Sequence, residues 1–147
     1  MLSLALAIEL KTAGLIWKPT ENDFFAVPGS DLDDRLFVLS DMMAAHTMLR
    51  GWPAITFHGA SEWALDYILM NEVVWMPSEE QLRQELVFAL DQIEPSTHLA
   101  LTLQGDGRYQ LAITFQQQPL AFSAPTAAET YGQALLHLLR HATQASD

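Results

Sequence analysis

The sequence predicts an α+β fold, a single domain in which antiparallel strands pack with helices. Three observations indicate this class. The chain has 147 residues and 50% of them are hydrophobic, which matches one domain with ample material for a core. Its second half alternates between helix and strand patterns, with a Gly-Asp-Gly turn between two strands. Two helix starts carry the capping-box sequences Ser-x-x-Gln and Thr-x-x-Glu. A subdivision into 1–77 and 78–147, sharing one core, is the alternative organisation.

The first half begins with a helix and continues with strands. Ser3 is placed to cap a helix from Leu4 to Ala13, and Gly14 follows where a helix C-terminus favours a left-handed residue. The Phe- and Val-rich runs DFFAV and RLFVLS predict a hairpin with a long loop. The run DMMAAHTMLRG fits either a short helix or an irregular Met-rich segment. PAITFHG predicts a strand that ends at Gly59.

The middle of the sequence predicts two helices. The first is predicted from about Ser61 to Met70, and the short strand EVVWMP follows it. Ser78 then opens a second helix, directly after a proline. Its apolar residues recur at helical spacing and define one buried face, made of Leu82, Leu86, Ala89, Leu90 and Ile93.

The last third predicts a β-meander followed by a helix. THLALTL and YQLAITF are strand patterns on either side of QGDGR, and PLAFSA is a third strand. Thr126 caps a final helix that runs to about Ala142. The predicted order is therefore α-β-β-β-α, with both helices against the meander. The buried face of the last helix is expected to contain Tyr131, Ala134, Leu135, Leu138 and Ala142.

Charge and composition exclude several classes of function. The net charge is −11, with 18 acidic and 7 scattered basic residues, so binding to nucleic acid or to an anionic membrane is disfavoured. The absence of cysteine excludes disulfides and thiol chemistry, and it fits a cytoplasmic location. No apolar run reaches the ~18 residues of a membrane span. The segment MLSLALAIELK lacks the basic start and the cleavage site of a signal peptide, so it is interpreted as a buried helix.

The segments LSDM, TFHG, EWALDYIL and EVVWMPSEEQLR resemble a small bacterial family of unknown function, some of whose members carry a pilus-assembly label. The frame of ELKTAGL, WMPSEEQLRQEL and TAAETYGQALLHLL is also similar to small phage-associated proteins of unknown function. The resemblance implies an α/β sandwich and no catalytic residues. An assembly ATPase would need a phosphate-binding loop, and no G-x-x-x-x-G-K-[ST] sequence is present.

The stretch TFHGASEWALDYIL contains the strongest candidates for catalysis. On the predicted helix, Glu62 and Asp66 are four residues apart on one polar stripe, and His58 lies beside the turn that precedes it. Such a group could perform acid–base catalysis. The structural alternative makes the two acids a solvated face, His58 a partner of the loop, and Ser61 an N-cap.

Two further groups have the composition of metal sites. His137 and His141 are four residues apart on the last helix, a spacing that metal ligands use, although no third ligand is evident. The wheel places them on the exposed side, near Thr130 and Gln133. The run from Asp31 to Asp34 has the acidity of a calcium loop without its full pattern. We interpret both groups as solvated polar surface.

The residues suited to an interaction surface are tryptophans and methionines. Trp52, Trp63, Met42 and Met43 are the candidates, since exposed aromatic and Met side chains form adaptable contacts. The first hypothesis is therefore a non-enzymatic module that binds a protein partner or forms a homodimer. The second is a small enzyme or ligand-binding protein. The third is an acidic mimic of nucleic acid. No cofactor is expected.

Overall fold

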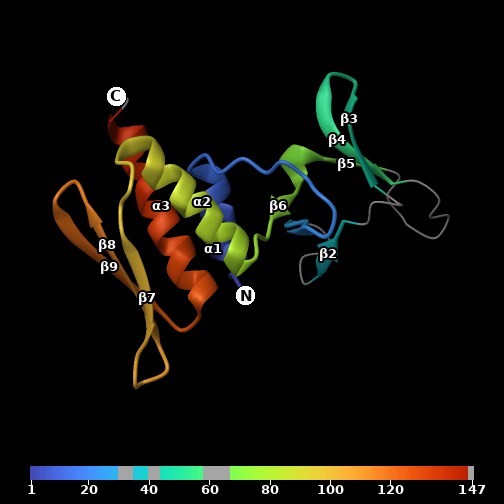
Figure 1. The fold of residues 1–147 in the computed structure, drawn as a ribbon. Helices are drawn as coiled ribbons and strands as arrows, with labels where there is room; N and C mark the ends of the chain where they lie inside the picture. The colour runs from blue at the N-terminus through green and yellow to red at the C-terminus, as the bar shows by residue number, and fades with distance from the viewer. Residues whose placement is uncertain (30–34, 40–43, 58–66, 146–147) are drawn as a thin grey trace. The chain divides into compact units, whose positions relative to one another are not determined.

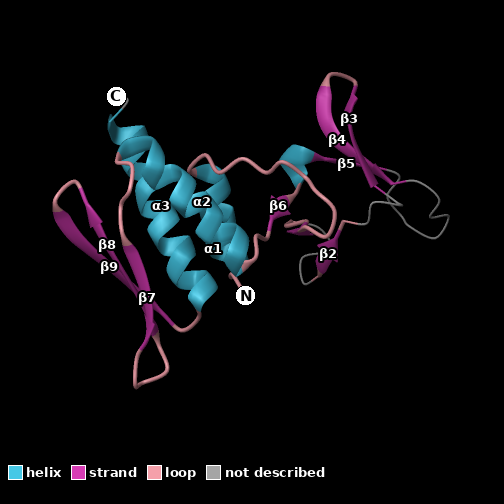
Figure 2. Cartoon of the chain, viewed as in Figure 1, coloured by secondary structure: helices cyan, strands magenta, loops and turns pink. Residues whose placement is uncertain are grey.

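The computed structural model describes residues 1–147 except 30–34, 40–43, 58–66 and 146–147. It divides into two compact units, one of Met1–Leu15 with Pro77–Asp147 and one of Ile16–Met76. The described residues contain three α-helices and three antiparallel three-stranded sheets, so the predicted α+β class is confirmed (Figure 2). One boundary between the units lies near residue 77, and the N-terminal helix belongs to the same unit as the C-terminal half.

As described, the first unit consists of three helices and one meander, which Figure 1 labels. The helices are α1 (Leu4–Thr12), α2 (Glu79–Ile93) and α3 (Ala127–Ala145). The sheet has the order β7-β8-β9, with strands Leu99–Leu103, Tyr109–Phe115 and Gln118–Ala124. Helix α3 contacts α1, α2, β8 and β9, whereas α2 packs mainly on α3. The predicted meander and closing helix are confirmed, but the expectation that α2 and α3 both lie against the sheet is wrong.

The helix starts follow the capping sequences. The Ser3 hydroxyl accepts a hydrogen bond from the Leu6 amide at 3.3 Å. Ser78 and Gln81 form the complete capping box, with bonds of 3.2 Å and 2.9 Å. At α3 the box is only half made, because the Glu129 amide donates to the Thr126 hydroxyl at 3.1 Å while the Glu129 carboxylate accepts from the Ser3 amide instead. Glu129 therefore joins the first turn of α3 to the start of α1.

The core of this unit lies along α3. The predicted faces of α2 and α3 are buried at Leu82, Leu86, Leu90, Tyr131, Ala134, Leu135 and Leu138. Ile93 of α2 and Ala142 of α3 are exposed, so the prediction that they are buried is wrong. Thr130, predicted to lie on the exposed side of α3, is fully buried and donates its hydroxyl proton to the Thr126 carbonyl at 2.8 Å. Because the hydroxyl is satisfied by its own helix, its burial leaves no unpaired polar group.

The second unit contains two small sheets. One has the order β2-β1-β6, with strands Leu36–Val38, Phe24–Ala26 and Val74–Trp75. The other has the order β3-β4-β5, with strands Ala44–Leu49, Trp52–Phe57 and Tyr67–Leu69, and the 3-10 turn η1 (Met70–Glu72) follows it. The β1–β2 hairpin and the strands at β4 and β6 are confirmed.

Two expectations for this unit are wrong. The segment from Ala44 to Leu49 is a strand rather than a helix or an irregular segment, because it pairs with β4 along its whole length. The predicted helix to Met70 is replaced at its described end by strand β5, in which Tyr67 pairs with Thr56. Both segments gain their backbone hydrogen bonds from a neighbouring strand, which local sequence patterns do not reveal.

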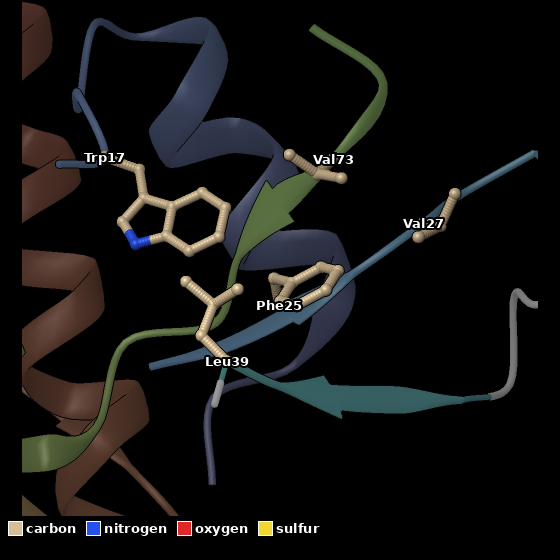
Figure 3. Close-up of a cluster of buried hydrophobic side chains, with 5 residues drawn as sticks. All are labelled: Trp17, Phe25, Val27, Leu39 and Val73. Atoms are coloured by element: carbon tan, nitrogen blue, oxygen red, sulfur yellow. The ribbon is translucent and has the colours of Figure 1, made fainter. Parts of the chain in front are cut away.

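A compact aromatic cluster forms the core of the second unit. Figure 3 shows its members, which are Trp17, Phe25, Val27, Leu39 and Val73. The ring centroids of Trp17 and Phe25 are 5.6 Å apart. A buried carboxylate supports the cluster, because Asp23 accepts hydrogen bonds from Trp17 Nε1 at 2.9 Å and from the Thr20 amide at 3.0 Å. These two hydrogen bonds give the buried Asp23 side chain polar partners, as buried polar groups require.

Candidate functional site

Several predicted site residues lie outside the part of the chain that the structure describes. They are His58, Glu62, Asp66, Trp63, Met42, Met43 and the run from Asp31 to Asp34. Whether His58 and the two carboxylates converge therefore stays a prediction. The predicted site residues that are described are Trp52, His137 and His141.

Trp52 lies at the tip of the β3–β4 hairpin. The connecting residues Arg50 and Gly51 have φ values of 52° and 86°, as a two-residue turn with left-handed backbone requires. The strand register pairs Leu49 with Trp52 and Met48 with Pro53. Since side chains alternate between the faces of a strand, Trp52 and Met48 lie on opposite faces. Trp52 is 59% exposed and Met48 is 62% exposed, so the tip presents an apolar side chain on each face.

A second exposed apolar group lies on the β1–β2 hairpin. Phe24 and Val38 are directly paired across the strands and are 40% and 53% exposed. Leu36 lies on the same face and is 38% exposed. The opposite face carries the paired residues Phe25 and Phe37, whose rings lie 5.5 Å apart in the core cluster. The hairpin is thus apolar on both faces, and the face of Phe24 is exposed at Phe24, Leu36 and Val38 but buried at Ala26, which pairs with Leu36.

A groove runs along α3 in the first unit. Its volume is about 380 Å³ and it is lined by Phe122, Gln133, Leu136, His137, Arg140 and His141. His137 is exposed and His141 is half-buried. Each imidazole lies edge-on to a phenylalanine of the sheet, with centroids 5.6 Å apart for His137 with Phe122 and for His141 with Phe115. The two histidines therefore contact the sheet, and they do not belong to a purely solvated helix face.

Whether His137 and His141 hold a metal ion stays a prediction. Among the described residues, no group of three or more His, Cys, Asp or Glu side chains is placed to hold one. Arg140, whose guanidinium pairs with the Glu9 carboxylate at 3.1 Å, lines the same groove. Imidazoles that lie edge-on to aromatic rings suit packing between the helix and the sheet.

Two described groups have perturbed pKa values, and neither lines the groove. Burial raises the pKa of Tyr131 above its ordinary value, while the charge of Arg83 opposes the shift. Burial also lowers the pKa of Lys11. Both residues lie on helices of the first unit, and desolvation within the helical packing accounts for both directions.

Comparison of the chain with models of protein families, with curated proteins and with solved structures finds no match. The resemblance to bacterial and phage-associated families accordingly stays a hypothesis. Among the helices that the structure describes, none combines the length and apolar character needed to cross a membrane.

Sequence reasoning missed the exposed face of the β1–β2 hairpin. Phe24 and Phe25 are adjacent, so strand alternation alone requires that they point to opposite faces. That pattern, combined with Leu36 and Val38 in the partner strand, was the signal available for an exposed apolar face.

Proposed function

We propose that this protein is a non-enzymatic protein-interaction module, and that the tip of the β3–β4 hairpin belongs to its contact surface. The observation that carries the proposal is Trp52, an indole that is 59% exposed at the end of a tight turn. Tryptophan is enriched among the residues that dominate binding energy, because it buries a large area and loses few degrees of freedom. Met48 on the other face supplies an adaptable apolar contact.

The partner is a protein or a second copy of this chain. A net charge of −11 favours a partner with a basic surface around the apolar contact and opposes binding to nucleic acid. We place the protein in the cytoplasm because its sequence has no cysteine and needs no disulfide. The alternatives are an enzyme that uses His58 with Glu62 or Asp66 and an acidic mimic of nucleic acid; both stay predictions.

Site-specific photo-crosslinking tests the proposal. The photoreactive amino acid benzoylphenylalanine replaces Trp52 in one variant and Gln118 in a control, since Gln118 is also exposed on a strand. Irradiation in the producing cells should give a discrete crosslinked species from position 52 and none from position 118. The mass of that species identifies its second component as another protein or as this chain. The same set of species from both positions would refute the proposal.

A further inference from the structure

Strand β7 has an open edge. Within the described residues its only neighbour in the sheet is β8, because the sheet order is β7-β8-β9. The backbone N–H of Gln104 donates to the backbone carbonyl of Arg108 at 2.8 Å, so these two residues form a hydrogen-bonded pair of the ladder. Because bonded and non-bonded pairs alternate in an antiparallel ladder, the backbone groups of Thr102 and Ala100 point toward β8. The N–H and C=O groups of Leu99, Leu101 and Leu103 therefore point away from the sheet.

No side chain of β7 is charged, and its three leucines are apolar. No Asp, Glu, Lys or Arg occurs from residue 95 to residue 105, in a chain whose net charge is −11. The side chains of Leu99 and Leu101 are half-buried, and Leu103 is 61% exposed. All three lie on the face that carries buried Leu111 and Ile113 of β8. Proteins usually protect an edge strand with a charge or a proline, and β7 has neither.

The opposite edge of the same sheet is protected. On the other side of β8, Gln110 pairs with Ser123 of β9. The backbone groups of Gln110 bond to β7, so they do not bond to Ser123. The backbone N–H and C=O groups of Ser123 therefore point away from the sheet. The guanidinium of Arg108 donates to the Ser123 carbonyl at 3.3 Å and thereby occupies it. Two residues earlier on that edge is Ala121, and before it Pro119, which has no N–H to donate. Between the two edges of this sheet, as far as the structure describes it, β7 is therefore the less protected one.

A second copy of β7 fits this edge. The strand reads Leu-Ala-Leu-Thr-Leu, so an antiparallel copy centred on Leu101 pairs Leu101 with itself and Leu99 with Leu103. All of these pairs use outward-pointing backbone groups, and about six hydrogen bonds would form. The leucine side chains would also meet across the axis. Two chains of charge −11 repel each other over most of their surface, and an uncharged strand is where they can approach.

We infer that the chain forms a two-fold symmetric dimer by antiparallel pairing of β7 with β7 of a second copy, which joins the two meanders into one six-stranded sheet. The inference rests on the proposed function, since it identifies one partner and the surface that binds it. This surface belongs to the first unit, whereas the Trp52 tip belongs to the second unit. Separate variants can therefore test the two surfaces.

Charge substitution at the two-fold axis tests the inference. Light scattering on the eluting wild-type protein should give a mass that rises with concentration from 16.4 kDa toward about twice that value. Leu101→Lys and Leu101→Glu each place like charges directly opposite one another and should remain monomeric when alone. An equal mixture of the two variants should recover the dimer, which also shows that both are folded. The matched control Ala121→Lys, on the β9 edge, should dimerise like the wild type.

Three results would overturn the inference. They are a wild-type chain that stays at monomer mass up to about 1 mM, dimers of either Leu101 variant alone, or no dimer in their mixture. None of these results bears on crosslinking at position 52. A different pair of results would refute the proposed hairpin contact and support the β7 pairing. In that case no crosslinked species forms at position 52, and the two Leu101 variants dimerise only when they are mixed.

Discussion

Replacing Gly132 by alanine should destabilise the protein even though alanine is the better helix former. A Cβ atom at Gly132 would lie 2.8 Å from Leu2 Cδ1 and 2.9 Å from Leu6 Cδ2, closer than the ~3.5 Å of ordinary carbon contacts. Both leucines are buried, with 3% and 8% of their surface exposed, so neither side chain can move freely away from an added methyl group. The glycine therefore permits the close approach of α1 to α3.

Two opposing effects set the magnitude. Alanine in place of glycine favours a helix interior by about 1 kcal/mol. Forcing an extra methyl group into a packed core costs about 1–3 kcal/mol. We expect Gly132→Ala to lower the free energy of unfolding by about 1 kcal/mol, since the two contacts fall well below normal distances but involve the ends of flexible side chains.

Urea denaturation of four proteins measures this effect. They are the wild type, Gly132→Ala, Leu6→Ala and the double variant. Leu6→Ala alone should cost about 2–5 kcal/mol, because it leaves a cavity. In that background the Leu6 Cδ2 contact is absent, so Gly132→Ala should cost less or become stabilising, with a coupling energy of about 1 kcal/mol. A stabilising effect of Gly132→Ala in the wild-type background, or a coupling energy of zero, would refute the proposed close packing.

Three other predictions concern stability. Asp23→Ala should lower the free energy of unfolding by about 2–3 kcal/mol, because it leaves the Trp17 indole and the Thr20 amide without this acceptor; a loss under about 0.5 kcal/mol in urea denaturation would contradict that role. Burial raises the pKa of Tyr131, so above pH ~10 the unfolded chain loses this proton before the folded chain does. Stability should therefore fall as pH rises above ~10, and Tyr131→Phe should make the fall shallower; equal slopes in pH-dependent denaturation would exclude this cause. Trp52→Ala should cost under about 1 kcal/mol in urea denaturation, because the indole is largely exposed, and a cost above ~2 kcal/mol would indicate a packing residue.

The features that were predictable from the sequence are those fixed by nearby residues. The capping box at Ser78, the glycine that ends α1 and the Gly-Asp-Gly turn each act within a few positions of the chain, and the structure confirms them. Most of the buried faces of α2 and α3 was predictable for the same reason, because the helical period alone places their leucines on one side.

The features that were not predictable depend on distant partners. Strands β3 and β5 exist because β4 lies between them, and neither has a distinctive local pattern. Glu129 was expected to complete its own capping box, but its carboxylate instead accepts a hydrogen bond from the backbone amide of Ser3, which is distant in sequence. The environment of His137 and His141 depends on which side of α3 meets the sheet, which the helix wheel does not specify.

The most direct test of the central claim is the crosslinking comparison between positions 52 and 118. If the hairpin tip is an interaction surface, position 52 yields one discrete crosslinked species. At a constant level of the chain, the amount of this species should reach a plateau as the light dose rises. The control at position 118 yields none, because Gln118 is exposed without an apolar contact to offer. Crosslinks of the same pattern and amount at both positions would contradict the claim that Trp52 binds a protein.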